Sequence, residues 1–94
     1  MKLNFFYSEN KATYAYTKEG KNYLLDYTLD KIEEAINPKS FFRINRGQII
    51  RIDAIKDISV YSTSRLKIIL NKYSEQDCIV SREKVNDFRF WLEN

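Results

Sequence analysis

The chain has 94 residues, of which 44% are hydrophobic and 15% aromatic, so we expect one small domain with a single core. It contains no histidine and one cysteine, which excludes His-dependent acid–base catalysis, Ser-His-Asp and Cys-His nucleophiles, an internal disulfide and most zinc sites. The formal net charge of +3 permits binding to nucleic acid or to an anionic membrane surface but demands neither.

The first third of the chain predicts three strands. Residues 3–7, LNFFY, are apolar and aromatic and predict a strand, whereas the polar residues 8–11, SENK, predict a loop. Residues 12–17 and 22–27 predict a β-hairpin, in which Gly20 supplies the positive φ that such a turn needs.

Residues 28–38 predict the clearest helix, because apolar side chains recur at helical spacing. The apolar positions are Leu29, Ile32 and Ile36. Thr28 is suited to cap the N-terminus, and Pro38 is expected to end the helix because the residue before a proline avoids the α region. Glu33 and Glu34 are expected to face solvent.

Residues 41–45, FFRIN, alternate apolar and polar side chains and predict a strand with one buried face. The core-facing residues are Phe42 and Ile44. Arg43 and Asn45 are expected to point outward along the polar face. There the side chain of Arg43 can either contact a ligand or form an ion pair with an acidic residue, Asp53 or Glu34.

Gly47 ends this strand and is expected to let the chain turn sharply, which presents Arg46 at a loop edge. The β-branched residues of 49–61 predict one bent strand or two short ones. Beyond them, residues 62–65 predict a turn, 65–70 a further strand and 71–77 a loop.

The C-terminal segment predicts a second helix at residues 81–92, after the short apolar run 78–80. Ser81 is suited to be its N-cap, and Cys78 is expected to be a small buried hydrophobe rather than a reactive thiol. The apolar face of this helix, which we expect to pack on the core, contains Val85, Phe88, Trp91 and Leu92.

Basic and amide side chains recur in three predicted loops. They are Lys11 and Thr13 in the first loop, Asn45, Arg46 and Gln48 in the second, and Arg82 and Lys84 in the third. Arginine contacts guanine edges or phosphates, Asn and Gln pair with adenine, and Lys binds phosphate as a point charge. These types favour nucleic-acid binding, although a single surface arginine is most often only solvated.

From the residues alone, several function classes stay open. The seven tyrosines favour a protein-interaction module, since Tyr is enriched at interfaces, and an RNA-binding β domain is a further alternative. An enzyme built on Asp, Glu, Lys and Tyr has no supporting constellation, and no Gly-rich phosphate loop is present. We therefore expect no catalytic activity, no cofactor and no metal.

Two segments, taken in order, resemble the LytTR family of DNA-binding domains. Residues 41–58 resemble its pattern of an aromatic residue, an arginine, a polar pair and an apolar pair, here Phe42, Arg43, Asn45–Arg46 and Ile49–Ile50. The stretch Val80–Ser81–Arg82 resembles the one that opens the family's terminal helix. The resemblance covers nearly the whole chain, and two positions depart from the pattern, because Gly47 stands where Ser is frequent and Arg51 where Asn is common.

The resemblance implies a single domain at residues 1–94 that is mostly β with minor α, built from small stacked antiparallel sheets and two short helices. It also implies sequence-specific binding of double-stranded DNA, with two loops in successive major grooves and one over the minor groove between them. By motif position, the DNA-binding residues would be Lys11, Thr13, Asn45, Arg46, Gln48, Arg82 and the weaker candidate Lys84. Our hypothesis is that Arg46 meets a phosphate or the minor groove and that Arg82 meets base edges.

The family further implies a bacterial, cytoplasmic response regulator of a two-component system, which controls transcription by pairing two domains on promoter repeats. A receiver domain and a sensor kinase would act upstream. Family members usually carry an extra strand or two before residues 3–7, so we expect this chain to be an excised fragment that lacks them. An open sheet edge with a risk of strand exchange would follow. No apolar run reaches 18 residues, so no membrane-spanning segment is expected.

Overall fold

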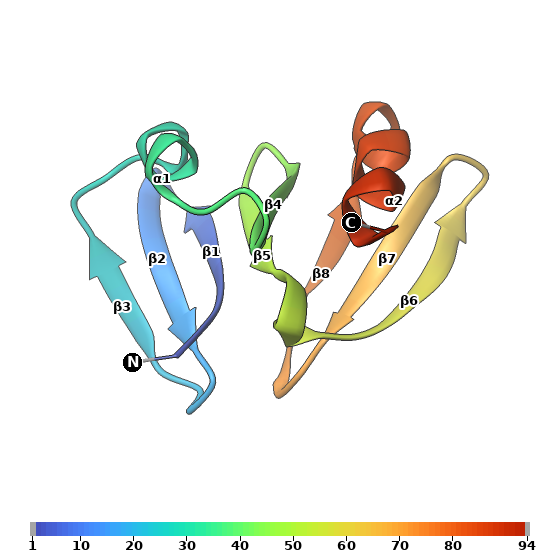
Figure 1. Cartoon of the computed structure of the whole chain (residues 1–94). Coiled ribbons are helices and arrows are strands. Elements are labelled where there is room, and N and C mark those ends of the chain that lie inside the picture. The colour runs from blue at the N-terminus through green and yellow to red at the C-terminus, as the bar shows by residue number, and fades with distance from the viewer. Residues whose placement is uncertain (1, 94) are drawn as a thin grey trace.

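Two antiparallel sheets lie side by side in the computed structural model, which describes residues 2–93 (Figure 1). Within that range, sheet 1 has the strand order β3-β2-β1-β5-β4 and sheet 2 the order β6-β7-β8. The strands are β1 (Leu3–Glu9), β2 (Ala12–Thr17), β3 (Asn22–Leu25), β4 (Phe41–Asn45), β5 (Gln48–Arg51), β6 (Ile55–Ser62), β7 (Arg65–Leu70) and β8 (Tyr73–Val80).

Short helices complete the fold. They are α1 (Leu29–Ala35), α2 (Val85–Glu93) and the single 3-10 turns η1 (Ile52–Ala54) and η2 (Arg82–Lys84). The predicted fold class, mostly β with two short helices, is therefore confirmed. No helix within residues 2–93 is both long enough and apolar enough to cross a membrane.

The central strand of sheet 1, β1, is buried on both faces, which explains its continuous apolar sequence. Phe5 and Tyr7 face the main core, which lies between the two sheets, whereas Phe6 faces a second core under α1. The second core contains Phe6, Ala15, Leu29, Ile32 and Ile49. Sheet 1 is thus the middle layer of the molecule, with α1 on one face and sheet 2 opposite the other.

Helix α2 packs its aromatic face into the main core. Phe88 is fully buried, and its ring centroid lies 5.6 Å from that of Phe42 and 5.8 Å from that of Trp91. Trp91 Nε1 also donates a hydrogen bond of 2.9 Å to the carbonyl of Pro38. These contacts hold α2 beside β4, so the helical stripe predicted from the sequence is confirmed as core packing.

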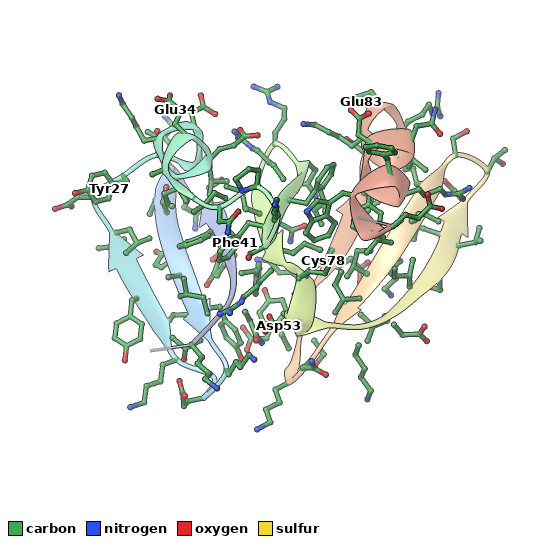
Figure 2. The ribbon with its side chains drawn as sticks, in the orientation of Figure 1. Tyr27, Glu34, Phe41, Asp53, Cys78 and Glu83 are labelled. Atoms are coloured by element: carbon green, nitrogen blue, oxygen red, sulfur yellow. The ribbon has the colours of Figure 1, made fainter. Side chains whose placement is uncertain are left out.

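The lone cysteine lies inside the molecule between the sheets (Figure 2). Burial is the main reason that the pKa of the Cys78 thiol is raised, to about 12. A thiol with such a pKa stays protonated at neutral pH and is a poor nucleophile. The expectation that Cys78 acts as a small buried hydrophobe is therefore confirmed.

Helix α1 begins as predicted and ends earlier than predicted. The hydroxyl of Thr28 accepts a hydrogen bond of 3.2 Å from the backbone N–H of Lys31, which is the predicted N-cap. The last helical residue is Ala35, because Ile36 already adopts an extended backbone and packs against the core under α1. The helix therefore stops three residues before Pro38, not at it.

Two predicted loops are tight turns between longer strands. Strand β1 continues to Glu9, and only Asn10 and Lys11, with φ of 52° and 66°, connect it to β2. Residues 71–77 were predicted as a loop, and this prediction is wrong, because β8 begins at Tyr73 and Lys72 makes the turn with φ of 59°. Four consecutive exposed polar residues, 74–77, hide the period-two pattern of this strand.

The segment 49–61 forms two strands, and the strands belong to different sheets. Strand β5 is the last strand of sheet 1 along the chain and lies between β1 and β4. The turn η1 follows it, and β6 is the first strand of sheet 2. The turn η1 is the covalent connection between the two sheets, and its residue Ala54 is fully buried in the main core. The predicted Gly20 turn between β2 and β3 is also confirmed, since Gly20 has φ of 86°.

A matched pair of leucines tests the core between the sheets. Leu70→Ala should lower the free energy of unfolding by about 2–5 kcal/mol, because Leu70 is only 3% exposed and its removal leaves a cavity. Leu24→Ala, at a leucine that is 67% exposed, should change it by less than about 0.5 kcal/mol. Denaturant unfolding followed by tryptophan fluorescence measures both, and equal losses would contradict this core.

Candidate nucleic-acid interface

Turns from three separate parts of the chain meet at one edge of the molecule, the upper edge in Figure 1. The N–H of Ser8, at the end of β1, donates a hydrogen bond of 3.0 Å to the carbonyl of Gly47 in the β4–β5 turn. The N–H of Ser81, just after β8, donates one of 2.9 Å to the carbonyl of Ile44. The fold therefore brings the three sequence-predicted loops to one edge.

The side chain of Asn45 holds the β4–β5 turn against sheet 2. Its Nδ2 donates to the carbonyl of Ile79 at 2.7 Å and to Oε1 of Gln48 at 2.9 Å, and its Oδ1 accepts from the N–H of Gly47 at 2.8 Å. Nε2 of Gln48 in turn donates to the carbonyl of Asp77 at 3.3 Å. Both amides, predicted to pair with bases, are thus engaged inside the protein.

Glycine is not required by the backbone at position 47. Gly47 lies outside the left-handed region, and a Cβ added there would stand 3.6 Å from Oγ of Ser8 and 3.7 Å from Oδ1 of Asn45, which are ordinary contact distances. The turn is formed by the hydrogen bond from Gly47 to Asn45. The interpretation that Gly47 permits the sharp turn is therefore wrong, because a Cβ would fit at this position.

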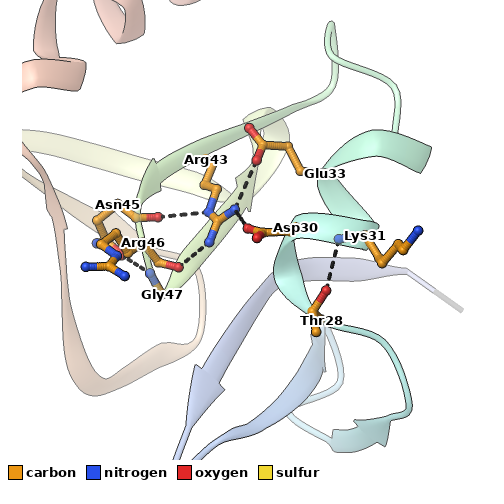
Figure 3. Close-up of polar contacts among 8 residues, drawn as sticks. All are labelled: Thr28, Asp30, Lys31, Glu33, Arg43, Asn45, Arg46 and Gly47. Carbon is orange, nitrogen blue, oxygen red and sulfur yellow. Dashed lines mark hydrogen bonds and ion pairs between the residues drawn. The ribbon is translucent and has the colours of Figure 1, made fainter.

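Arg43 joins the β4–β5 turn to α1 (Figure 3). Its guanidinium donates to the carbonyls of Asn45 at 3.3 Å and Arg46 at 2.5 Å. The same group also donates to Asp30 at 2.5 Å and to Glu33 at 3.0 Å. Glu33 is exposed, as predicted, and it forms this ion pair at the surface. The hydrogen bond from Arg43, followed by its charge, lowers the pKa of Asp30 below its ordinary value.

This network decides the alternatives left open for Arg43. Its ion-pair partners are Asp30 and Glu33, rather than Asp53 or Glu34. Asp53 is instead paired with Arg51, at 2.9 Å, and with a lysine. Arg43 therefore positions the carbonyl groups around Arg46, and its own side chain, 15% exposed, is not available to a large ligand.

Beside this turn, three arginines line an open hollow of 590 Å³, which we call hollow A. They are Arg46 from the β4–β5 turn, Arg65 from the start of β7 and Arg82 from η2. No ion pair involves any of these three among the described residues, and Glu83 is the one acidic residue in the lining. Sequence reasoning missed Arg65, although it follows a correctly predicted turn.

The remaining predicted residues differ in how far they are accessible. Lys11 is exposed at the tip of the β1–β2 turn, whereas Thr13 is 8% exposed within β2 and Gln48 is 6% exposed. Lys84 is half-buried, with its Nζ 6.0 Å from the ring centroid of Phe42. Lys11 therefore joins Arg46 as an accessible group, while Thr13 and Gln48 expose very little surface to a ligand.

The structure thus defines a small β domain of two sheets that collects arginines from turns and strand ends at one edge. The family model described as the LytTr DNA-binding domain matches residues 1–93, and the chain belongs to this family. The resemblance predicted from the sequence is confirmed.

A solved structure has the same fold. It is the LytTr DNA-binding domain of a Bacillus cereus protein described as a putative methyl-accepting/DNA response regulator. The TM-score is 0.88 at 24% sequence identity, and the match covers 99% of this chain and 83% of that one. A comparison with curated proteins finds no match.

Replacing Asn45 tests whether its amide clamps the turn. Asn45→Ala removes three hydrogen bonds in a partly buried site, so the free energy of unfolding should fall by about 1–3 kcal/mol. The control Asn86→Ala changes an exposed asparagine of α2 and should alter it by less than about 0.5 kcal/mol. Urea denaturation compares them, and an Asn45→Ala loss as small as that of the control would refute the clamp.

The Arg43–Asp30 pair predicts a pH dependence. The lowered pKa of Asp30 means that its contribution to stability is complete above its ordinary value of 3.8 and is lost as the pH falls through the lowered pKa. Asp30→Asn should therefore melt below the wild type at about pH 7, and the two melting temperatures should converge as the pH falls through the lowered pKa of Asp30. The control Asp26→Asn removes an exposed carboxylate, and the same convergence there would contradict a specific role for Asp30.

Proposed function

We propose that this chain is the sequence-specific, double-stranded-DNA-binding output domain of a bacterial, cytoplasmic transcriptional response regulator. Membership of the LytTr DNA-binding family supports the ligand class. The observation that carries the proposal is hollow A, in which Arg46, Arg65 and Arg82 converge without an ion pair among the described residues. Arginines without an ion pair at one edge favour a polyanion, because their guanidinium groups are free to contact phosphates.

In this proposal the edge reads DNA through its turns. Arg82 contacts base edges in a major groove, where its planar fork matches guanine, and Arg46 contacts a phosphate or the minor groove. Lys11, at the exposed β1–β2 turn, contacts the backbone or the next groove. Asn45, Gln48 and Thr13 act by holding these turns in place, since their side chains are engaged or buried.

Lys84 has a separate role in the proposal. Lys84 is the last residue of η2, directly before α2, and its ammonium lies over the ring of Phe42. The N–H of Lys84 donates to the carbonyl of Ser81 at 2.9 Å, so Lys84 belongs to the turn that carries Arg82. The hydroxyl of Ser81 donates to the carbonyl of Ile44 at 3.3 Å instead of capping the helix as predicted. Lys84 therefore supports Arg82 more than it contacts phosphate.

We further propose that the domain functions within a longer regulator. A receiver domain, phosphorylated by a sensor kinase, would bring two such domains onto adjacent promoter repeats. The net charge of +3 is modest, so tandem binding would raise the affinity through effective concentration. The similar Bacillus cereus domain, which comes from a protein described as a response regulator, supports this context.

One observation favours a protein-binding role as the second candidate. Tyr23, Leu24 and Tyr27 are exposed along and just after β3, which is an edge strand of sheet 1. Figure 2 shows the labelled Tyr27 pointing away from the body of the molecule. Salt separates the two roles, because phosphate contacts release counterions and apolar contacts do not. RNA binding is less favoured, because Tyr73 is buried and most aromatic rings fill the core, although Tyr61 on β6 is 50% exposed.

Selection from a randomised duplex pool tests the proposed function. The wild type should enrich a short sequence, with affinity that falls as salt rises. Arg82→Ala should cost about 1–3 kcal/mol at one base position and relax preference there, whereas Arg46→Ala should weaken binding to all sequences alike. Fluorescence anisotropy at two salt concentrations measures both variants.

The control for charge is Lys21→Ala, which removes one positive charge from the β2–β3 turn at the opposite edge (Figure 1). It should leave affinity and preference nearly unchanged. If all three substitutions weaken DNA binding equally, the binding reflects only a general attraction of DNA to positive charge on the protein. No enriched sequence, together with no binding at low salt, would sink the DNA proposal and favour the protein-binding role.

A further inference from the structure

A second hollow adjoins hollow A on the side of the β6–β7 turn, and we call it hollow B. Its volume is 370 Å³. The polar residues that line it are Ser62, Thr63, Ser64, Arg65, Arg82, Asn86 and Arg89. Arg65 and Arg82 line both hollows, so the two form one continuous surface. The lining of hollow B includes no carboxylate.

The fold holds the arginines of hollow B on two rigid elements. Arg82 and Arg89 are seven residues apart, two turns of helical chain, and therefore lie on the same face of the η2–α2 segment. Phe88, next to Arg89, is fully buried and anchors that helix. Arg65 is paired with Ser62 across the tight β6–β7 turn, which places Arg65 in the lining of the same hollow.

The arginines of this protein divide into two sets. Arg43 and Arg51 form ion pairs with acidic residues. The other four, for which the described residues provide no ion pair, all line hollow A or hollow B; they are Arg46, Arg65, Arg82 and Arg89. Guanidinium groups that share a hollow repel one another, so a bound anion would remove an electrostatic cost as well as add hydrogen bonds.

We propose that hollow B binds a backbone phosphate of the same DNA whose bases meet Arg82 in hollow A. This inference rests on the proposed function and extends the contact surface past the β6–β7 turn. Three guanidinium groups and three hydroxyls are donors that suit phosphate oxygens, and phosphate contacts fix the register of a protein on the duplex. Arg89 supplies affinity and register, while Arg82 supplies sequence preference.

The test compares Arg89→Gln with Lys21→Gln, which loses the same charge at the opposite edge (Figure 1). Arg89→Gln should weaken binding about two- to fivefold on every sequence at low salt. It should also lower the slope of log affinity against log salt by about one unit, whereas Lys21→Gln should change neither quantity. Circular dichroism and thermal melting of both variants check that the fold is intact.

A second arm locates the phosphate itself. Duplexes that carry one neutral methylphosphonate at successive positions are titrated with the wild type and with Arg89→Gln. One flanking position should weaken the wild type and leave Arg89→Gln unaffected, because that variant has already lost the contact. This non-additivity distinguishes a direct contact from a general loss of charge.

Three results would overturn the inference, and they can be told apart. If Arg89→Gln behaves like Lys21→Gln while Arg82→Ala still loses preference, hollow B is not part of the interface and the proposed function stands. If Arg89→Gln changes sequence preference, Arg89 contacts a base rather than a phosphate. If the wild type binds no duplex, the proposed function and this inference fail together.

Discussion

The contact between the β4–β5 hairpin and the end of β8 is the constraint on which the rest of the structure depends. The two sheets are linked covalently only through the short turn η1, so their relative position must be fixed by packing and by hydrogen bonds across the gap. Asn45 reaches the carbonyl of Ile79, and Ser81 reaches the carbonyl of Ile44. These bonds close the upper end of the main core and set Arg46 beside Arg82.

The arginines differ in whether an acidic residue of the protein pairs with them. The acidic residues of α1 neutralise Arg43, and Asp53 neutralises Arg51, so these arginines act within the protein. Burying a guanidinium without such partners would cost several kcal/mol, which is why the half-buried Arg43 takes two carboxylates and two carbonyls. The other four arginines have no ion pair among the described residues, and the fold gathers them along hollows A and B at one edge.

Much of the fold was predictable because it depends on local patterns. The α1 cap at Thr28, the Gly20 turn and the apolar stripe of α2 follow from spacing and residue type alone. The first half of β8 was not predictable, because its exposed polar residues carry no periodic signal. The roles of Asn45 and Gln48 were also hidden, since an amide that binds a base and one that clamps a turn look alike in sequence, and only the position of β8 decides between them.

The same reasoning explains why the accessible site differs from the predicted one. Motif position placed Thr13 and Gln48 among the DNA contacts, but both lie within strands. Strand β1 continues past the predicted residue 7 to Glu9 and pairs Ser8 with Thr13, and β5 begins at Gln48, one residue earlier than predicted, so both side chains are buried in the sheet. Arg65 lies far from any motif and reaches the site only because β7 pairs with β6 at a tight turn. Residues that are neighbours in a motif can thus differ in burial, so that only some of them are accessible. Residues that are distant in sequence can be brought to the same site by strand pairing. For a domain that presents basic groups from turns, the length of each strand decides which side chains a ligand can reach.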